Sequence, residues 1–186
     1  MKTVVKNIIL SVTLSFAFVG MLSVSAASQQ ADLAKNIFRL HIIANSNSKA
    51  DQDLKLEVRD KIIATFGQDL FNLDKVEKVA NDFITSKGYS YTAKAEVGNF
   101  WFPVKTYGDI SMPAGNYNAL RITLGEGKGQ NWWCCIYPNL CINGKVAVFD
   151  SRAKAILKGK LSKEEYKLIT KKEPLRWRIL EWWNSM

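Results

Sequence analysis

The hydrophobic pattern of this chain changes its period twice, and this change limits the possible folds. Apolar residues alternate over residues 37–44, recur every three to four positions over about 51–86, and alternate again over 89–124. Alternation is the period of a strand, and a spacing of three to four is that of a helix. The order of elements therefore predicts an α+β domain, in which helices pack on a mainly antiparallel sheet.

The first alternating segment is predicted to be a central strand. Its two faces carry, in turn, Phe38, Leu40, Ile42 and Ala44, and then Ile37, Arg39, His41 and Ile43. Because neither face is fully polar, we expect other elements to cover the sheet on both sides.

Two helices are predicted to follow this strand before the chain returns to the sheet. Ser48 and Asp51 have the spacing of a capping box, and Gly67 is expected to end the first helix. The second helix is expected over about 73–86, before Gly88. The two apolar stripes consist of Leu54, Val58, Ile62 and Phe66, and of Val76, Val79, Ala80, Phe83 and Ile84.

A four-stranded meander and a helical C-terminus are predicted for the rest of the chain. We expect its strands at 89–97, 100–107, 117–124 and 132–137, with a tight turn at Gly98-Asn99. The glycine-rich segment 125–130 is expected to be a long hairpin turn, because Gly129 after Lys128 breaks the spacing of a phosphate-binding loop. Helices are expected near 151–157, 162–170 and 175–183.

The first 26 residues have the three parts of a signal peptide. Lys2 and Lys6 precede an apolar run at 8–19, and Val24-Ser25-Ala26 offers small residues for cleavage after Ala26. An uncleaved anchor is the alternative, because residues 8–27 could span a bilayer. In both cases the folded part lies outside the cytoplasm. We divide the chain into a signal peptide or anchor (1–26), a linker or helical lead-in (27–36) and one domain (37–186).

The charge of the chain is basic, with a net value of +9, or +7 once Lys2 and Lys6 are removed with the signal peptide. In an exported protein this favours contact with anionic lipid or cell wall over nucleic acid. A generic basic surface is the alternative. The tryptophan-rich segment 175–183 suits either a membrane interface or docking onto the domain, through the face that carries Leu175, Ile179, Trp182 and Trp183.

Three cysteines lie close together near the end of the predicted sheet. Cys134 and Cys141 bracket a loop that could bring their Cα atoms within disulfide distance, and an exported chain meets oxidising conditions. A Cys135–Cys141 pair and reduced thiols are the alternatives. A zinc site built with His41 is disfavoured, since neighbouring strand cysteines point to opposite faces. A thiol hydrolase is disfavoured as well, because only the residue counts support contact between a thiolate and His41. No metal or cofactor is expected.

Polar and aromatic residues mark the candidate binding surface. Arg39 and His41 share one strand face, and a polar turn and helix start follow that strand directly. Trp132 and Trp133 cannot both face the core of one strand, so one is expected to be exposed or covered by another element. The predicted partner-binding residues are Arg39, His41, Asn45, Ser46, Asp51, Asn131, Trp132 and Trp133.

Two blocks of sequence, RLHIIANSNSKADQDLKLEVRD at 39–60 and GEGKGQNWWCCIYPNLC at 125–141, carry a resemblance to a known family. Their content and order resemble the stage II sporulation protein R family. The family's signature keeps cysteines at Cys134 and Cys141, which implies that these two pair, and has an aliphatic residue where this chain has Cys135.

The resemblance also implies a function. It implies a secreted signal without catalytic activity, which acts between the forespore and mother-cell membranes. Such a signal activates a membrane-embedded aspartic protease, stage II sporulation protein GA, which then processes the sigma-E precursor. The alternative hypothesis is an exported cell-wall or small-ligand enzyme that uses the polar cluster between Arg39 and Asp51.

Overall fold

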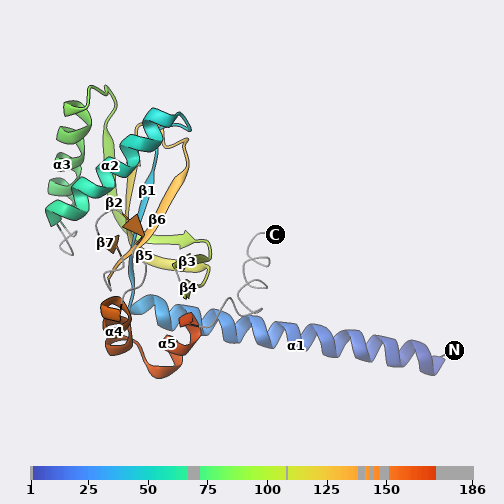
Figure 1. Ribbon diagram of the computed structural model, residues 1–186. Helices are drawn as coiled ribbons and strands as arrows, with labels where there is room; N and C mark the ends of the chain where they lie inside the picture. Colours follow the sequence, from blue (N-terminus) through green and yellow to red (C-terminus); the bar gives the residue numbers. More distant parts are fainter. Residues whose placement is uncertain are drawn as a thin grey trace.

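A computed structural model of the chain describes residues 2–66, 72–107, 109–137, 141–142, 145–146 and 151–170 (Figure 1). Its elements, in chain order, are α1 (Lys2–Lys35), β1 (Phe38–Ile43), α2 (Lys49–Phe66), α3 (Leu73–Ser86), β2 (Ala93–Phe102), β3 (Lys105–Tyr107), β4 (Ile110–Met112), β5 (Gly115–Leu124), β6 (Asn131–Tyr137), β7 (Cys141–Ile142), β8 (Lys145–Val146), α4 (Ser151–Lys160) and α5 (Lys163–Thr170).

The main sheet has four strands in the order β2-β5-β1-β6. The first strand in sequence lies in its interior, as predicted from the apolar residues on both of its faces. It pairs parallel to β5, with Arg39 beside Ala119, and antiparallel to β6, with Leu40 beside Cys134. Strands β2 and β5 pair antiparallel along ten residues. The fold is therefore α+β, with a mostly antiparallel sheet and helices packed on it.

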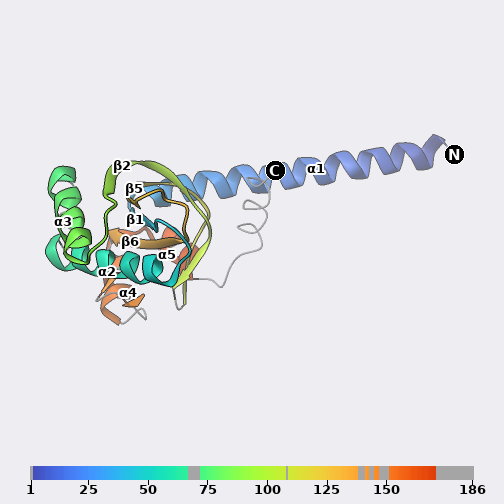
Figure 2. The same cartoon turned by 90° about the horizontal axis from the view of Figure 1, so that it is seen from above.

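Helices α2 and α3 cover one face of this sheet (Figures 1 and 2). The helical stripes predicted from the sequence meet strand residues there in one core, whose buried members are Leu40, Ile42, Leu54, Val58, Ile62, Val76, Ala80, Ile84, Ala93, Ala95, Leu120, Ile122, Leu124, Cys134 and Ile136. Burying each of the large side chains contributes about 1.5–3 kcal/mol before the cost of ordering the chain.

A second core covers the opposite face. It is built from the C-terminal end of α1, the β3–β4 hairpin, α4 and α5, and its buried members are Leu33, Ile37, Phe102, Tyr107, Ile110, Met112, Tyr117, Ala119, Cys135, Leu157, Leu161 and Ile169. Residues 27–35 thus belong to a helix, and Leu33 is fully buried within this core. Cover on both faces explains why neither face of β1 is fully polar.

The predicted turn at Gly98-Asn99 is wrong. Strand β2 runs through both residues without a break and pairs with β5 from Ala93 to Phe102. Gly98 instead makes room for an aromatic ring, since a Cβ placed there would lie 3.0 Å from the ring of Phe100. That ring in turn lies 4.1 Å from the guanidinium of Arg121. The strand also begins at Ala93 and not at Tyr89.

The glycine-rich segment 125–130 is not a hairpin turn, which corrects the second part of the meander prediction. It joins β5 to β6, and these strands are not neighbours, because β1 lies between them. The loop therefore crosses the C-terminal end of β1.

The helices of the C-terminal region agree with the prediction as far as they are described. Helices α4 and α5 lie within three residues of the expected bounds at each end. The predicted helix at 175–183 lies outside the described residues.

Helix α1 projects away from the folded body (Figure 1). Its segment Thr3–Met21 is long and apolar enough to cross a membrane, with a mean hydropathy of 1.8. An apolar helix at this position fits a signal peptide.

Candidate functional site

The turn after β1 and the glycine-rich loop form one structure, which we call the polar corner (residues 44–52 and 125–130). The backbone N–H of Gly129 donates to the carbonyl of Ala44 at 2.9 Å, and that of Lys128 to the carbonyl of Asn45 at 3.0 Å. The side-chain oxygen of Asn45 accepts from the N–H of Glu126 at 2.9 Å. Two segments about 80 residues apart in sequence are therefore fastened to each other.

Asp51 is the centre of the polar corner. It is 6 % exposed, and its carboxylate accepts hydrogen bonds from Asn45 Nδ2 at 2.9 Å, Ser46 Oγ at 2.6 Å and Tyr91 OH at 2.6 Å. Burial acts to raise the pKa of Asp51, but the hydrogen bonds from Ser46, Tyr91 and Asn45 together outweigh it and lower the pKa. The backbone N–H of Asp51 donates to Ser48 Oγ at 3.1 Å, which is one half of the predicted capping box.

Lys55 connects the next turn of α2 to the loop. Its Nζ donates to the side chain of Gln52 at 2.6 Å and to the backbone carbonyl of Gln130 at 2.9 Å. Burial of this amine, with a smaller contribution from Arg59, lowers its pKa. The amine of Lys55 therefore fastens the loop 125–130 to helix α2.

Arg39 lies fully buried in the second core, below the polar corner on β1. Its guanidinium lies 4.2 Å from the ring centre of Phe102 and 4.9 Å from that of Tyr117, and it donates to Tyr107 OH at 3.0 Å. Aromatic faces attract such a cation, and this attraction compensates part of the cost of burying it. Arg39 thus organises the second core from within.

His41 lies two residues further along β1 on the same face. Its ring stacks on Trp133, with centres 3.7 Å apart and planes at 18°, and its Nε2 lies 2.7 Å from Asn131 Oδ1. Burial lowers the pKa of His41 to about 4, and the nearby charges of Arg121 and Arg39 add to the effect. The ring is therefore neutral at pH 7, with Nε2–H donating to Asn131.

The two neighbouring tryptophans lie on opposite faces of the sheet, as strand geometry requires. Trp133 packs in the second core beside Phe102, and Trp132 packs against the first core under Arg59, whose guanidinium lies 4.8 Å from its ring centre. Both rings are half-buried. Each is covered by a described element.

The adjacent cysteines also separate between the two cores. Cys134 is disulfide-bonded and lies in the first core. Cys135 keeps its thiol in the second core, where burial raises its pKa to about 12. The side chain of Cys141 lies outside the described residues, so its pairing with Cys134 stays a prediction.

Comparison with known proteins gives a match over this region of the chain. The sequence pattern of the family described as stage II sporulation protein R matches residues 34–147. The chain belongs to the stage II sporulation protein R family. It is 34 % identical over 158 residues to stage II sporulation protein R of Bacillus subtilis (strain 168), an alignment that covers 75 % of this chain and 70 % of that protein. No solved structure matches the chain.

The region shared with the stage II sporulation protein R family contains both the polar corner and the arginine–histidine face of β1. The sequence predicted one cluster from these residues, and the structure divides them into two. Asn45, Ser46 and Asp51 gather in the polar corner, whereas Arg39 and His41 lie in the second core with Trp133. Asn131 is exposed beside the loop. Their role in partner binding stays a prediction.

Four residues that shape the site were not predicted from the sequence. Tyr91 and Lys55 hold the polar corner, Tyr107 binds Arg39, and Arg59 covers Trp132. Lys55 and Arg59 lie inside the block 39–60 that carries the family resemblance, so the resemblance could have indicated them as candidate site residues. Tyr91 and Tyr107 carry no such signal, because their hydrogen bonds join residues that lie far apart in the sequence.

The described polar groups of the site mainly hydrogen-bond and stack with other residues of the fold. Among the residues that the structure describes, no group of three or more histidine, cysteine, aspartate or glutamate side chains could hold a metal ion. The described hydrogen bonds occupy the carboxylate of Asp51, and stacking fixes the ring of His41. The arrangement can present a rigid surface to a partner.

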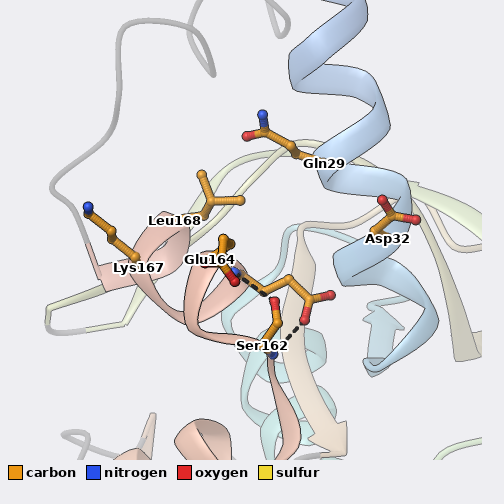
Figure 3. A pocket seen from close by; sticks show the side chains of 7 residues that line it. Gln29, Asp32, Ser162, Glu164, Lys167 and Leu168 are labelled. Carbon is orange, nitrogen blue, oxygen red and sulfur yellow. Dashed lines mark hydrogen bonds between the residues drawn. The ribbon is translucent and has the colours of Figure 1, made fainter.

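A separate hollow of about 630 Å³ lies between α1 and α5 (Figure 3). It is lined by Gln29, Asp32, Ser162, Glu164, Glu165, Lys167 and Leu168, and contains none of the predicted site residues. The dashed bonds in Figure 3 are those of the capping box of α5: the backbone N–H of Ser162 donates to the carboxylate of Glu165 at 2.7 Å, and the backbone N–H of Glu165 donates to Ser162 Oγ at 3.1 Å.

Proposed function

We propose that this chain is an exported sporulation signal that binds and activates a membrane-embedded aspartic protease of the stage II sporulation protein GA type. Activation of that protease leads to processing of the sigma-E precursor. The observation that carries the proposal is the family match over residues 34–147, which includes the whole polar corner. A ligand can activate a receptor without catalysis if it binds the active state more tightly than the inactive one.

The state of the polar groups supports a binding role over the alternative of a cell-wall or small-ligand enzyme. A general base or nucleophile needs an accessible group with a pKa near the working pH. The pKa of His41 is about 4, that of Cys135 is about 12, and both side chains are buried. Neither residue is prepared for acid–base or thiol chemistry at pH 7.

The exposed part of the polar corner is the surface that we propose for the protease. It lies at the end of β1 opposite to α1, so α1 does not cover it (Figure 1). Glu126 and Lys128 project there as an exposed ion pair at 2.7 Å, and Asn131 is exposed beside them. Arg39, His41 and Asp51 are buried and would act by holding this surface in shape.

The proposed place of action is the space between the forespore and mother-cell membranes. The apolar helix at Thr3–Met21 supports export, and the net charge of +7 that remains once Lys2 and Lys6 are removed would favour contact with an anionic membrane surface.

Cleavage after Ala26 is expected, which would leave a mature N-terminus at Ala27. The small residues Val24-Ser25-Ala26 follow the apolar run at the distance that signal peptidase recognises. N-terminal sequencing of exported protein checks this. Intact protein that starts at Met1 and stays embedded in the membrane would show that the segment is an anchor.

Co-production in one cell of this chain, the protease and the sigma-E precursor tests the proposed function. We expect precursor cleavage only when all three are present. Lys128→Glu should reduce cleavage about ten-fold, the equivalent of about 1.4 kcal/mol, because it reverses the charge at the centre of the proposed surface. Lys158→Glu, an equally large change on the exposed face of α4 outside the matched region, should have no effect.

Two results would contradict the proposal. One is the absence of protease-dependent cleavage with the wild-type chain. The other is a complete loss confined to a single acidic or nucleophilic side chain, in a variant that is exported and folded, because that pattern belongs to an enzyme.

A further inference from the structure

Strand β2 forms one edge of the main sheet, and α3 protects only its first half. The side chain of Asn81 accepts from the N–H of Ala93 at 2.6 Å and donates to its carbonyl at 3.3 Å. The carboxylate of Glu77 accepts from the N–H of Ala95 at 2.9 Å. These side chains take the place that a neighbouring strand would have.

The same row of backbone groups continues along the second half of β2. The backbone N–H and C=O groups of a strand point alternately to its two sides. Those of Val97, Asn99 and Trp101 therefore point away from β5, as those of Ala93 and Ala95 do. Within the described part of the chain, no other element hydrogen-bonds the backbone of these three residues. Their side chains are also exposed, Val97 by 43 % and Trp101 by 44 %.

The sequence of this second half of β2 lacks the residues that normally keep sheet edges apart, although at Asn99 it borders a hollow that the end of α1 also lines. Proteins protect exposed edges with charged residues, prolines or bulges. The window from Val97 to Phe102 contains none of these, and Pro103 follows only after β2 has ended. An edge of this kind is suited to pairing with another strand.

We propose that a second copy of this chain pairs with β2 in antiparallel orientation, about a two-fold axis at Asn99. This inference goes beyond the proposed function and does not depend on it. The symmetric register places Asn99 beside Asn99 of the other copy and Val97 beside Trp101. A β-branched residue beside an aromatic one is a favourable cross-strand pair, and both side chains would be removed from water.

The limits of the window support a copy of this chain as the occupant. In the symmetric register, Ala95 meets Pro103 of the other copy. The N–H of Ala95 already binds Glu77, and proline has no N–H to donate. The ladder therefore closes after three pairs at both ends without an unsatisfied N–H. Between positions 95 and 103, no pair of opposed residues in this register carries like charges.

The direction of α1 is compatible with this pairing in full-length chains. Helix α1 runs roughly perpendicular to the strands (Figure 1) and roughly perpendicular to the line along which neighbouring strands follow one another (Figure 2). It therefore runs along the normal of the sheet, away from one face. The two-fold axis of an antiparallel strand pair is also perpendicular to the sheet. Rotation about it keeps both α1 helices pointing the same way, as insertion of two uncleaved chains into one membrane would require.

Cysteine cross-linking of the full chain in cells tests the pairing. Asn99→Cys should form a disulfide-linked dimer, because Cα atoms of directly opposed residues lie about 5.5 Å apart, within the range for a disulfide. Asn118→Cys is the matched control. Asn118 is exposed on the same face and is the register partner of Asn99 on β5, but it lies one strand further from the axis. Equal cross-linking at both positions, or cross-linking of Asn99→Cys only to a different protein, would overturn the proposal.

Sedimentation of the full chain in detergent provides a second readout. The wild type should show a concentration-dependent dimer, and Asn99→Lys should weaken dimerisation at least about ten-fold, because two like charges then face each other on the axis. Asn118→Lys places the same charge one strand inward, where Asn118 Oδ1 accepts from Asn99 Nδ2 at 3.4 Å, and should weaken dimerisation much less than Asn99→Lys. A monomeric wild type, or equal effects of the two variants, would show the proposal to be wrong. Neither measurement requires the protease.

Discussion

Gly129→Ala is expected to lower the free energy of unfolding by about 3 kcal/mol, through overpacking and the loss of a loop hydrogen bond. A Cβ at this position would lie 2.3 Å from the backbone oxygen of Ser46 and 2.8 Å from the Cβ of Ala44. Neither atom can move without displacing β1 or the start of the polar corner. The hydrogen bond from Gly129 N–H to Ala44 would lengthen as the loop is pushed outward.

Gly159→Ala is the matched control for this substitution. Gly159 lies exposed in α4, and a Cβ there would meet no atom within 4 Å. Alanine is the better helix former by up to about 1 kcal/mol, so this variant should be as stable as the wild type or more so. Urea denaturation of the two variants and the wild type measures the difference. A Gly129→Ala protein within about 0.5 kcal/mol of the wild type would show that the loop does not pack on the corner as described.

The sequence predicted the helices of this fold well because their signals are local. The apolar stripes of α2 and α3 can be read from residues three and four apart, and both helices have the predicted faces in the first core. The interior position of β1 was also predictable, because a strand in which neither face is fully polar needs cover on both. These inferences use only neighbouring residues.

The strand order was not predictable in the same way. The parallel pairing of β1 with β5 places Arg39 beside Ala119, and no local pattern reports a contact over such a distance in sequence. Two glycine signals were misinterpreted for this reason. Gly98 accommodates the ring of Phe100 within a continuous strand, and the loop at 125–130 needs its glycines to cross over β1.

The candidate site was predicted as far as it is local. Asn45, Ser46 and Asp51 meet because they lie within seven residues of each other at the start of a capped helix. The third hydrogen bond to Asp51 comes from Tyr91, which reaches it only because α3 returns the chain to the sheet beside α2. Likewise, the separation of His41 from this cluster follows from its stacking on Trp133, a contact across paired strands.

His41 should make the protein lose stability as the pH falls from 6.5 to about 4. The pKa of His41 is lowered from 6.5 to about 4 in the folded state. Between these two pH values the imidazole is protonated in the unfolded chain and neutral in the folded chain, so a fall in pH favours unfolding. The folded state has its full stability above pH 6.5, and the free energy of unfolding then decreases by about 3 kcal/mol down to pH 4. His41 is the one histidine of the chain, so no other imidazole titrates between pH 6.5 and 4. Carboxylates, with ordinary pKa values of about 4, contribute little until the lower end of this range.

His41→Phe separates this titration from the packing of the ring. Phenylalanine keeps an aromatic ring against Trp133 and removes both nitrogens, of which Nδ1 has no hydrogen-bond partner among the described residues. Asn131 is exposed, so its side-chain oxygen can turn to water after losing His41. The variant should therefore resemble the wild type at pH 7 to within about 1 kcal/mol and stay nearly flat down to pH 4.5. Urea unfolding at a series of pH values measures both curves. A wild-type curve as flat as that of the variant would mean that His41 titrates as an exposed histidine and that its buried, stacked position is wrong.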